Sequence, residues 1–269
     1  MTAIEYANKI PQLQEVFVIY SALTRSPYVS CEEEDYKGEI NYFDEVIMYT
    51  QEKAAQEKAE ELKEADIPVV VMKVLKDQML LMFSELYLFG VDGLRIHTEE
   101  GTFFYLLDEI IRRPDLSKMP ENKRPLENPG LQLSMLYFMQ EIRRKSADKT
   151  SRKLHDLEEE MIANVMRSKF LVPVKESEQE QDGKKAAELL MVKMNDESLM
   201  IPIFSDGATF GRFVGQKDEI KAIVMTVDKL NSIQMPEKAV GFIINPNSVG
   251  VPIRKEYLEK LMQTSTWKV

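Results

Sequence analysis

The sequence predicts a mixed α/β protein of the α+β class, built as two similar tandem modules. Each module is expected to be a mixed sheet of about five strands with flanking helices. The chain has 269 residues, enough for about two domains at roughly 150 residues each. Short runs of β-branched and aromatic residues alternate with helical patterns along its whole length. The order of these segments is the same in both halves, and this repetition predicts the two modules.

The first half predicts eight elements. Residues 16–20 and 68–74 are apolar, β-branched runs typical of interior strands. Residues 51–65 are strong helix formers, and Thr50 is a suitable N-cap for them. In order, the elements are a helix at 3–13, a strand at 16–20, a hairpin at 28–50, a helix at 51–65, a strand at 68–74, a short helix at 76–83, a hairpin at 86–96 and a closing helix at 102–111.

The second half predicts the same order. Its last hairpin is the clearest, because one apolar run ends at Asn245-Pro246 and a second begins at Val249. Val91-Asp92-Gly93 stands in the corresponding place of the first half. The elements are a strand at 170–174, a polar loop at 175–185, a hairpin at 187–204, a helix capped by Ser205 or Asp206, a strand at 222–227, a short helix at 227–234, a hairpin at 240–253 and a closing helix at 255–262.

A proline-rich segment separates the halves. Four prolines fall within 16 residues of the stretch 113–130, a composition typical of a stiff linker. The pattern from 131 to 169 is helical, and polar residues at 145–148 predict a break into two helices. The expected modules are therefore residues 1–112 and 151–269, joined by the linker and helix of 113–150.

The charge is unevenly distributed. Residues 1–120 contain 12 basic and 23 acidic residues, a net charge of −11, whereas residues 121–269 contain 23 and 22, a net charge of +1. Nucleic acid is not expected as a partner, since phosphate contacts need clustered cations. The basic stretch 143–153 is expected either to dock on the acidic first half or to form a solvated helix face.

The expected location is the cytoplasm. No apolar run approaches the roughly 20 residues that cross a bilayer, so no membrane association is expected. The N-terminus lacks the basic and apolar regions of a secretory signal. The single cysteine, Cys31, forms no internal disulfide, which fits a reducing compartment.

No catalytic, metal or cofactor motif is present, so no cofactor is expected. The two histidines, His97 and His155, have no Cys or second His at ligand spacing. A Gly-x-Ser-x-Gly nucleophile turn, a P-loop and a Gly-x-Gly-x-x-Gly stretch are all missing.

Four segments of the second half form a recognisable pattern, namely 170–174, 202–206 with Phe210 and Phe213, 222–227 and 241–253. Through these segments the second half resembles the SseB N-terminal domain family over roughly residues 150–264. The first half resembles a diverged copy, in which Tyr49-Thr50 replaces Phe204-Ser205-Asp206. The family takes its name from a serine-sensitivity phenotype, some members carry a type III secretion label, and the resemblance implies no reaction.

The candidate site lies where strands end. Asp206, Phe210, Phe213, Asn245 and Asn247 are expected to bind a peptide or small ligand at one edge of the sheet. The structural alternative makes Asp206 a helix N-cap and Asn245 a turn residue.

Two functional accounts follow from this sequence. In the first, the chain is a non-catalytic binding or adaptor protein with a protein or peptide partner. In the second, it is an enzyme in which Asp206 works with Glu188 or Asp196. A secretion-associated role is a further alternative, and the oligomeric state is left open.

Overall fold

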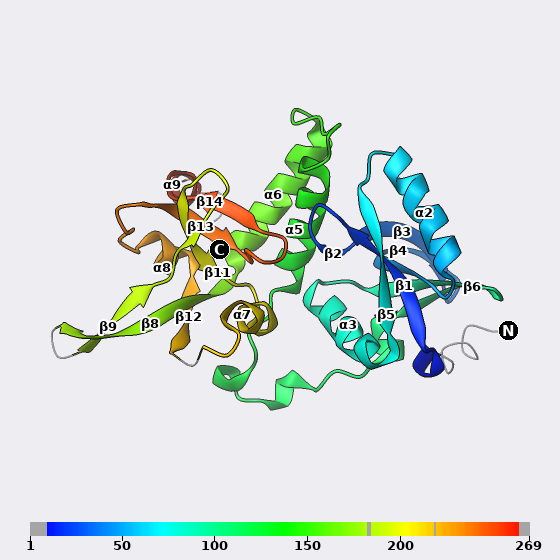
Figure 1. Ribbon diagram of the computed structural model, residues 1–269, viewed down its shortest axis with the longest axis horizontal. Coiled ribbons are helices and arrows are strands. Elements are labelled where there is room, and N and C mark those ends of the chain that lie inside the picture. Colours follow the sequence, from blue (N-terminus) through cyan, green and yellow to red (C-terminus); the bar gives the residue numbers. More distant parts are fainter. Residues whose placement is uncertain (1–9, 182–183, 218, 264–269) are drawn as a thin grey trace. The chain divides into compact units, whose positions relative to one another are not determined.

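The computed structural model describes residues 10–181, 184–217 and 219–263 (Figure 1). The chain divides into unit 1, Met1–Arg124 with Leu136–Leu154, and unit 2, Pro125–Met135 with His155–Val269. Among the described residues, unit 1 holds one seven-stranded sheet, and unit 2 holds a four-stranded and a three-stranded sheet. Helices flank these sheets, and parallel and antiparallel pairs occur together, which confirms the predicted mixed α/β class. The helix expected at 3–13 lies largely outside the described residues, and Ile10–Gln12 form the 3-10 turn η1.

Unit 1 is organised around strand β1, which pairs antiparallel with β5 on one side and with β2 and β4 on the other. Strand β4 then pairs parallel with β6, and β6 antiparallel with β7. Strands β3 and β4 form a hairpin. The elements are β1 (Glu15–Ser21), β2 (Ser26–Pro27), β3 (Val29–Tyr36), β4 (Glu39–Tyr49), α2 (Glu52–Glu64), β5 (Val69–Leu75), α3 (Lys76–Leu88), β6 (Gly93–Thr98), β7 (Gly101–Leu106) and α4 (Leu107–Ile110).

Helix α2 covers one face of this sheet (Figure 1). It buries Ala55, Ala59 and Leu62, three residues on one stripe of a helix whose other faces are charged. This stripe packs on alternate residues of the strands, which share a face because side chains alternate along a strand. The strand residues of this core are Phe17, Ile19, Ile47, Tyr49 and Val69.

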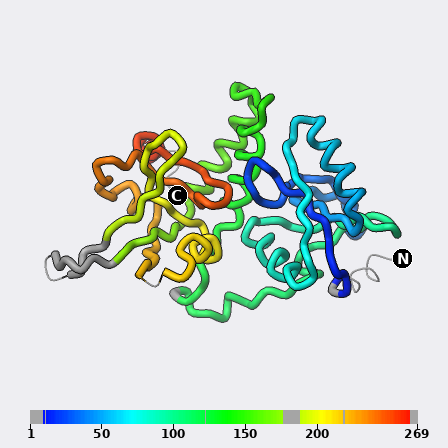
Figure 2. The backbone as a smooth tube through the Cα atoms, in the orientation of Figure 1, coloured from blue at the N-terminus to red at the C-terminus, as the bar shows by residue number. Residues whose placement is uncertain are grey.

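The strands of unit 2 follow a similar order but form two sheets. Strand β8 pairs antiparallel with β12, and a bridge between Leu171 and Phe204 joins it to the end of β11. Strand β11 is parallel to β13, and β13 is antiparallel to β14, which Figure 2 traces in orange to red. The elements are β8 (Lys169–Gln181), β9 (Lys184–Leu189), β10 (Val192–Lys193), β11 (Leu199–Ile203), α7 (Gly207–Val214), β12 (Ile220–Thr226), α8 (Val227–Asn231), β13 (Ala239–Ile244), β14 (Val251–Arg254) and α9 (Lys255–Gln263).

Two glycines identify equivalent positions in the two units. Gly93 of β6 and Gly241 of β13 each lie opposite the last residue of the following strand. A Cβ atom at Gly93 would lie 2.6 Å from the Tyr105 carbonyl oxygen, and one at Gly241 would lie still closer to that of Ile253. Both positions therefore require glycine, because the neighbouring backbone fills the space of a side chain.

This register corrects the predicted alignment of the two halves. Counting from the glycines, His97 rather than Val91-Asp92-Gly93 occupies the place of Asn245. Gln51 and Asp206 correspond as the N-cap residues of α2 and α7. Thr50 is not the cap that the sequence predicted, since its hydroxyl donates to the His97 carbonyl at 3.4 Å.

Several predicted elements are wrong in kind. Of the hairpin expected at 86–96, residues 86–88 end α3 and residues 93–96 lie in β6. The hairpin is β6–β7, so residues 102–106 of the helix expected at 102–111 are strand. Residues 175–181 and 184–185 of the expected loop belong to a β8–β9 ribbon, and β10 is only two residues long. That ribbon is polar, yet Lys175 lies opposite Glu188, and opposite charges stabilise a cross-strand pair.

The linker ends in two helices, as the break at 145–148 predicted. They are α5 (Pro129–Ile142) and α6 (Arg152–Arg167), preceded by the 3-10 turns η2 (Leu116–Lys118) and η3 (Glu121–Lys123). None of the helices in the described residues is long and apolar enough to span a membrane.

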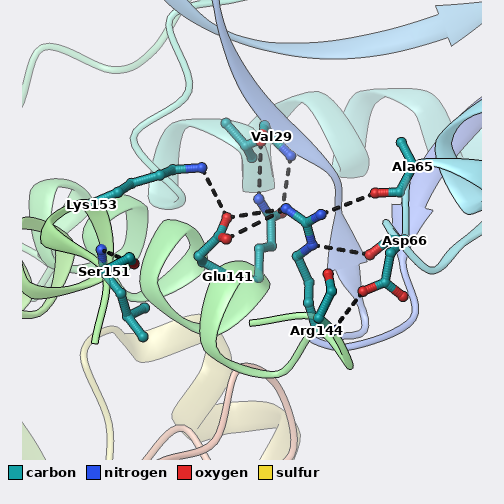
Figure 3. Close-up of polar contacts among 10 residues, drawn as sticks. Val29, Ala65, Asp66, Glu141, Arg144, Ser151 and Lys153 are labelled. Atoms are coloured by element: carbon teal, nitrogen blue, oxygen red, sulfur yellow. Dashed lines mark hydrogen bonds and ion pairs between the residues drawn. The ribbon is translucent and has the colours of Figure 1, made fainter. Parts of the chain in front are cut away.

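The basic stretch contacts the first half of the chain, as one of the two alternatives predicted (Figure 3). The Arg144 guanidinium donates to the carbonyl oxygens of Ala65 and Asp66, both at 3.0 Å. These carbonyls end α2, where the helix dipole attracts a cation. Residues 136–154 bring unit 1 to 20 basic and 26 acidic residues, a net charge of −6, against 15 and 19 in unit 2.

Candidate functional site

Asn245 is buried in the turn that follows β13. Its backbone has a φ of +49°, a left-handed conformation that Asn adopts more readily than most residues. Its side-chain oxygen accepts from the Ser205 backbone N–H at 3.1 Å, and its amide donates to the Ser205 hydroxyl at 2.8 Å and to Gln132 Oε1 at 3.2 Å. All parts of this side chain are therefore used inside the unit.

Asp206 is buried beside it and caps α7. One carboxylate oxygen accepts from the Thr209 backbone N–H at 2.7 Å. The other accepts from the hydroxyls of Thr209 at 2.8 Å and Ser205 at 3.0 Å, and from Gln132 Nε2 at 2.8 Å. Four donors thus satisfy the hydrogen-bonding capacity of this buried carboxylate inside the unit, as expected of a structural group.

Two residues of this network were not among the sequence candidates. Gln132, on the first turn of α5, bonds both Asp206 and Asn245. Asn128, just before α5, donates to the carbonyl oxygens of Ser205 at 2.6 Å and Lys169 at 3.0 Å. The Asn-Pro dipeptide marks the start of a helix, but no sequence signal connects it to residues 41 and 77 positions away.

The other candidates do not join the network. Phe210 and Phe213 are half-buried and pack their rings on buried Phe204, with centroids 5.6 and 4.9 Å apart. Asn247 is exposed in the turn after Asn245. The structure thus brings Asp206 and Asn245 together in the interior and leaves Asn247 at the surface.

The second acid that the enzymatic account requires is not among the partners of Asp206. Glu188 is exposed on β9, and Asp196 is exposed in the turn between β10 and β11. Asp196 accepts from the hydroxyl and backbone N–H of Ser198, which lower the pKa of its carboxyl. No group of three or more His, Cys, Asp or Glu within the described residues could hold a metal ion.

The corresponding edge of unit 1 has different chemistry. His97 stacks on Tyr49 with ring centroids 4.6 Å apart, and its Nδ1 lies 2.9 Å from the Thr102 hydroxyl. Burial lowers the pKa of His97, and the charges of Arg95 and Lys58 lower it further. Burial also raises the pKa of Tyr49 to about 12, so both rings are neutral near pH 7.

The largest exposed feature of unit 1 is the outer part of the β3–β4 hairpin, residues 31–44, here named the acidic arm. It holds six acidic residues and one lysine. Its residues pair only across the hairpin, because the β4–β6 pairing begins at Glu45 and the β4–β1 pairing at Met48. The arm therefore extends beyond the sheet.

One face of the acidic arm is closed by its own unit. Phe43 stacks on Phe104 of β7 at 4.9 Å, and Arg95 forms ion pairs with Glu34 at 2.8 Å and Glu45 at 2.6 Å. Burial raises the pKa of Glu45, and Arg95 opposes that shift. This face is occupied by internal contacts.

The opposite face of the arm is open. It carries Ile40 and Tyr42, which are 68% and 70% exposed, the largest values for big hydrophobic side chains in the described part of the chain. Across the hairpin, Glu33 lies opposite Tyr42 and Asp35 lies opposite Ile40. The Tyr42 hydroxyl donates to the Glu33 carboxylate at 3.1 Å. Apolar and acidic side chains thus lie side by side on one exposed surface.

Two solved structures resemble the chain over almost its whole length. The first is Tic22 from Plasmodium falciparum, 15% identical, covering 97% of this chain and 96% of that one, with a TM-score of 0.22. The second is Anabaena Tic22 (protein transport), 10% identical, covering 99% and 89%, with a TM-score of 0.23. No curated protein sequence matches the chain.

The segments of unit 2 that suggested a known family all belong to the structure just described. They include β11 with the Asp206 cap, and the β13–β14 hairpin with its Asn245 turn. Residues 149–260 of the chain match the family model "SseB protein N-terminal domain", which confirms the resemblance for the second half.

Proposed function

We propose that this chain is a non-catalytic binding protein, an adaptor whose acidic arm holds a segment of a partner protein. The open face of that arm carries the proposal, because Ile40 and Tyr42 are exposed between carboxylates rather than buried. The strand-end residues Asp206 and Asn245, in contrast, are satisfied by internal hydrogen bonds. A secretion-associated role, which the family label also allows, remains a prediction.

The chemistry of the arm selects the partner. An exposed apolar pair rimmed by Glu33 and Asp35 fits a segment that presents apolar side chains flanked by Lys or Arg. The arm has a net charge of −5, which attracts such a segment at long range and repels an acidic one. The expected partner segment is therefore basic and amphipathic.

A binding titration tests this. The probe is a fluorescent 14-residue peptide of alternating Lys and Leu, compared by anisotropy with the same peptide carrying Glu in place of Lys. The basic peptide should bind at least about tenfold more tightly at low salt, and the difference should shrink as salt rises.

Matched variants separate the acidic arm from general charge. The double variant E33K/D35K should weaken binding of the basic peptide about tenfold, since two attractions become repulsions. The control E57K/E60K makes the same change of net charge on the exposed face of α2. Equal losses in the two variants, or no binding by the unsubstituted chain, would rule out the acidic arm as the site.

A further inference from the structure

Strand β12 of unit 2 is an edge strand. It pairs with β8 and with no second strand among the described residues (Figure 1). Its three central residues, Ala222, Ile223 and Val224, are all exposed, and the last two are 39% and 49% exposed. Successive residues point to opposite faces, so both faces of the strand are uncovered at its centre.

Two other edges among the described strands carry features that block strand addition. Pro252 interrupts β14, and β10 is two residues long. In unit 1, β5 occupies the place of β12, and its Lys73 stands at the position of Val224 and pairs with Glu15 at 2.6 Å. Strand β5 also exposes Val70 and Met72, but its Lys73 is next to Met72, the residue that corresponds to Ile223, whereas the lysine of β12, Lys221, lies two residues from Ile223.

The sequence of β12 is compatible with pairing to itself. In an antiparallel two-fold pairing centred on Ile223, Ala222 lies opposite Val224 and Lys221 lies opposite Met225. No like charges face each other. The two copies of Lys221 would lie four residues apart along the strands, about 13 Å, which is beyond the Debye length of about 10 Å at 0.1 M salt.

We infer that the edge of β12 is a self-association surface whose occupant is β12 of a second copy of this chain. The two-fold pairing uses the same strand from both copies, so it closes at two and does not propagate into a filament. The main-chain groups of the two strands supply the hydrogen bonds, and Ile223 of each copy lies on the axis. The inference does not depend on the acidic arm, which lies in unit 1.

Light scattering after size exclusion tests the inference with the full chain over about 1 to 100 μM, a range that brackets micromolar association. The unsubstituted chain should approach twice its mass of 31.1 kDa as concentration rises. The variants I223K and I223E should each remain at 31.1 kDa, because each places like charges on the axis. An equimolar mixture of the two should recover the double mass, which shows that both variants are folded.

The matched control is M72K, at the corresponding position of β5, and it should leave the dimer intact. The inference is overturned by a monomeric unsubstituted chain, by a dimeric I223K, by a monomeric M72K, or by a mixture that stays monomeric. Binding of the basic peptide by I223K should be unchanged, so the two proposals can fail separately.

Discussion

Replacing Asn245 tests whether the strand-end polar network is structural. Asn245→Ala removes three hydrogen bonds and leaves a methyl group in a left-handed backbone conformation. Asn245→Gly removes the same hydrogen bonds, but glycine adopts that conformation without strain. The pair of variants therefore separates the cost of lost hydrogen bonds from the cost of the backbone.

The magnitude follows from the groups left behind. The buried Ser205 N–H and Gln132 Oε1 lose their partner, at about 1–3 kcal/mol each. A non-glycine residue in the left-handed region adds about 1–2 kcal/mol. Asn245→Ala should thus destabilise unit 2 by about 3–8 kcal/mol, and Asn245→Gly by about 1–2 kcal/mol less.

Hydrogen exchange with mass spectrometry measures this in the full chain, because peptides from β11 and β13 report the opening of unit 2 alone. Peptides from β1 and β4 provide an internal control, since unit 1 should keep its protection. A loss below about 1 kcal/mol for Asn245→Ala, or a glycine variant no better than alanine, would refute the structural role of the network.

Three further predictions concern contacts in both units. Arg144→Ala should destabilise unit 1 by about 1–2 kcal/mol in urea unfolding, because two carbonyls lose a charged donor. The control Lys145→Ala should cost under about 0.5 kcal/mol, and equal effects of the two variants would contradict this role of Arg144. Since the pKa of His97 is lowered in the folded chain, the unfolded chain takes up its proton first, and stability should fall as pH drops through about 6.5. His97→Asn should reduce the loss of melting temperature between pH 7.5 and 5.5, whereas the control at exposed His155, His155→Gln, should not. An unchanged pH dependence of the melting temperature in His97→Asn would count against the assigned role of His97. Gly93→Ala and Gly241→Ala should each cost about 1–3 kcal/mol in urea unfolding, because the added Cβ overlaps neighbouring atoms. The control Gly211→Ala, whose Cβ meets nothing within 4 Å, should be neutral or stabilising. Tolerance of either strand substitution would contradict the assigned register.

Much of the strand pattern could be predicted because burial determines it. The runs that became β1, β5 and β13 are continuous and apolar, as expected for strands covered on at least one face. The prediction for 86–96 was wrong because the end of α3 is a short apolar run. Periodicity and length do not distinguish such a run from a strand. Residues 175–181, the outer part of β8, are all polar and gave no apolar signal.

The partners of the candidate site could not be predicted from its own residues. Asp206 was expected either as a cap or as a ligand, and its capping bond to Thr209 is local enough to infer. Its bond to Gln132 joins positions 74 residues apart, and only the packing of α5 on the sheet edge brings them together. The equivalence of His97 and Asn245 likewise emerged from the strand register and not from residue type.

The most direct measurement compares two variants in one pair of assays, affinity for the basic peptide and melting temperature. Tyr42→Ala should lower the affinity and leave the melting temperature unchanged, because its side chain is exposed on the acidic arm. Asp206→Asn should lower the melting temperature and leave the affinity unchanged, because its carboxylate is buried among four donors. The reverse pattern, with affinity lost in Asp206→Asn and retained in Tyr42→Ala, would contradict the account and return the binding site to the strand ends.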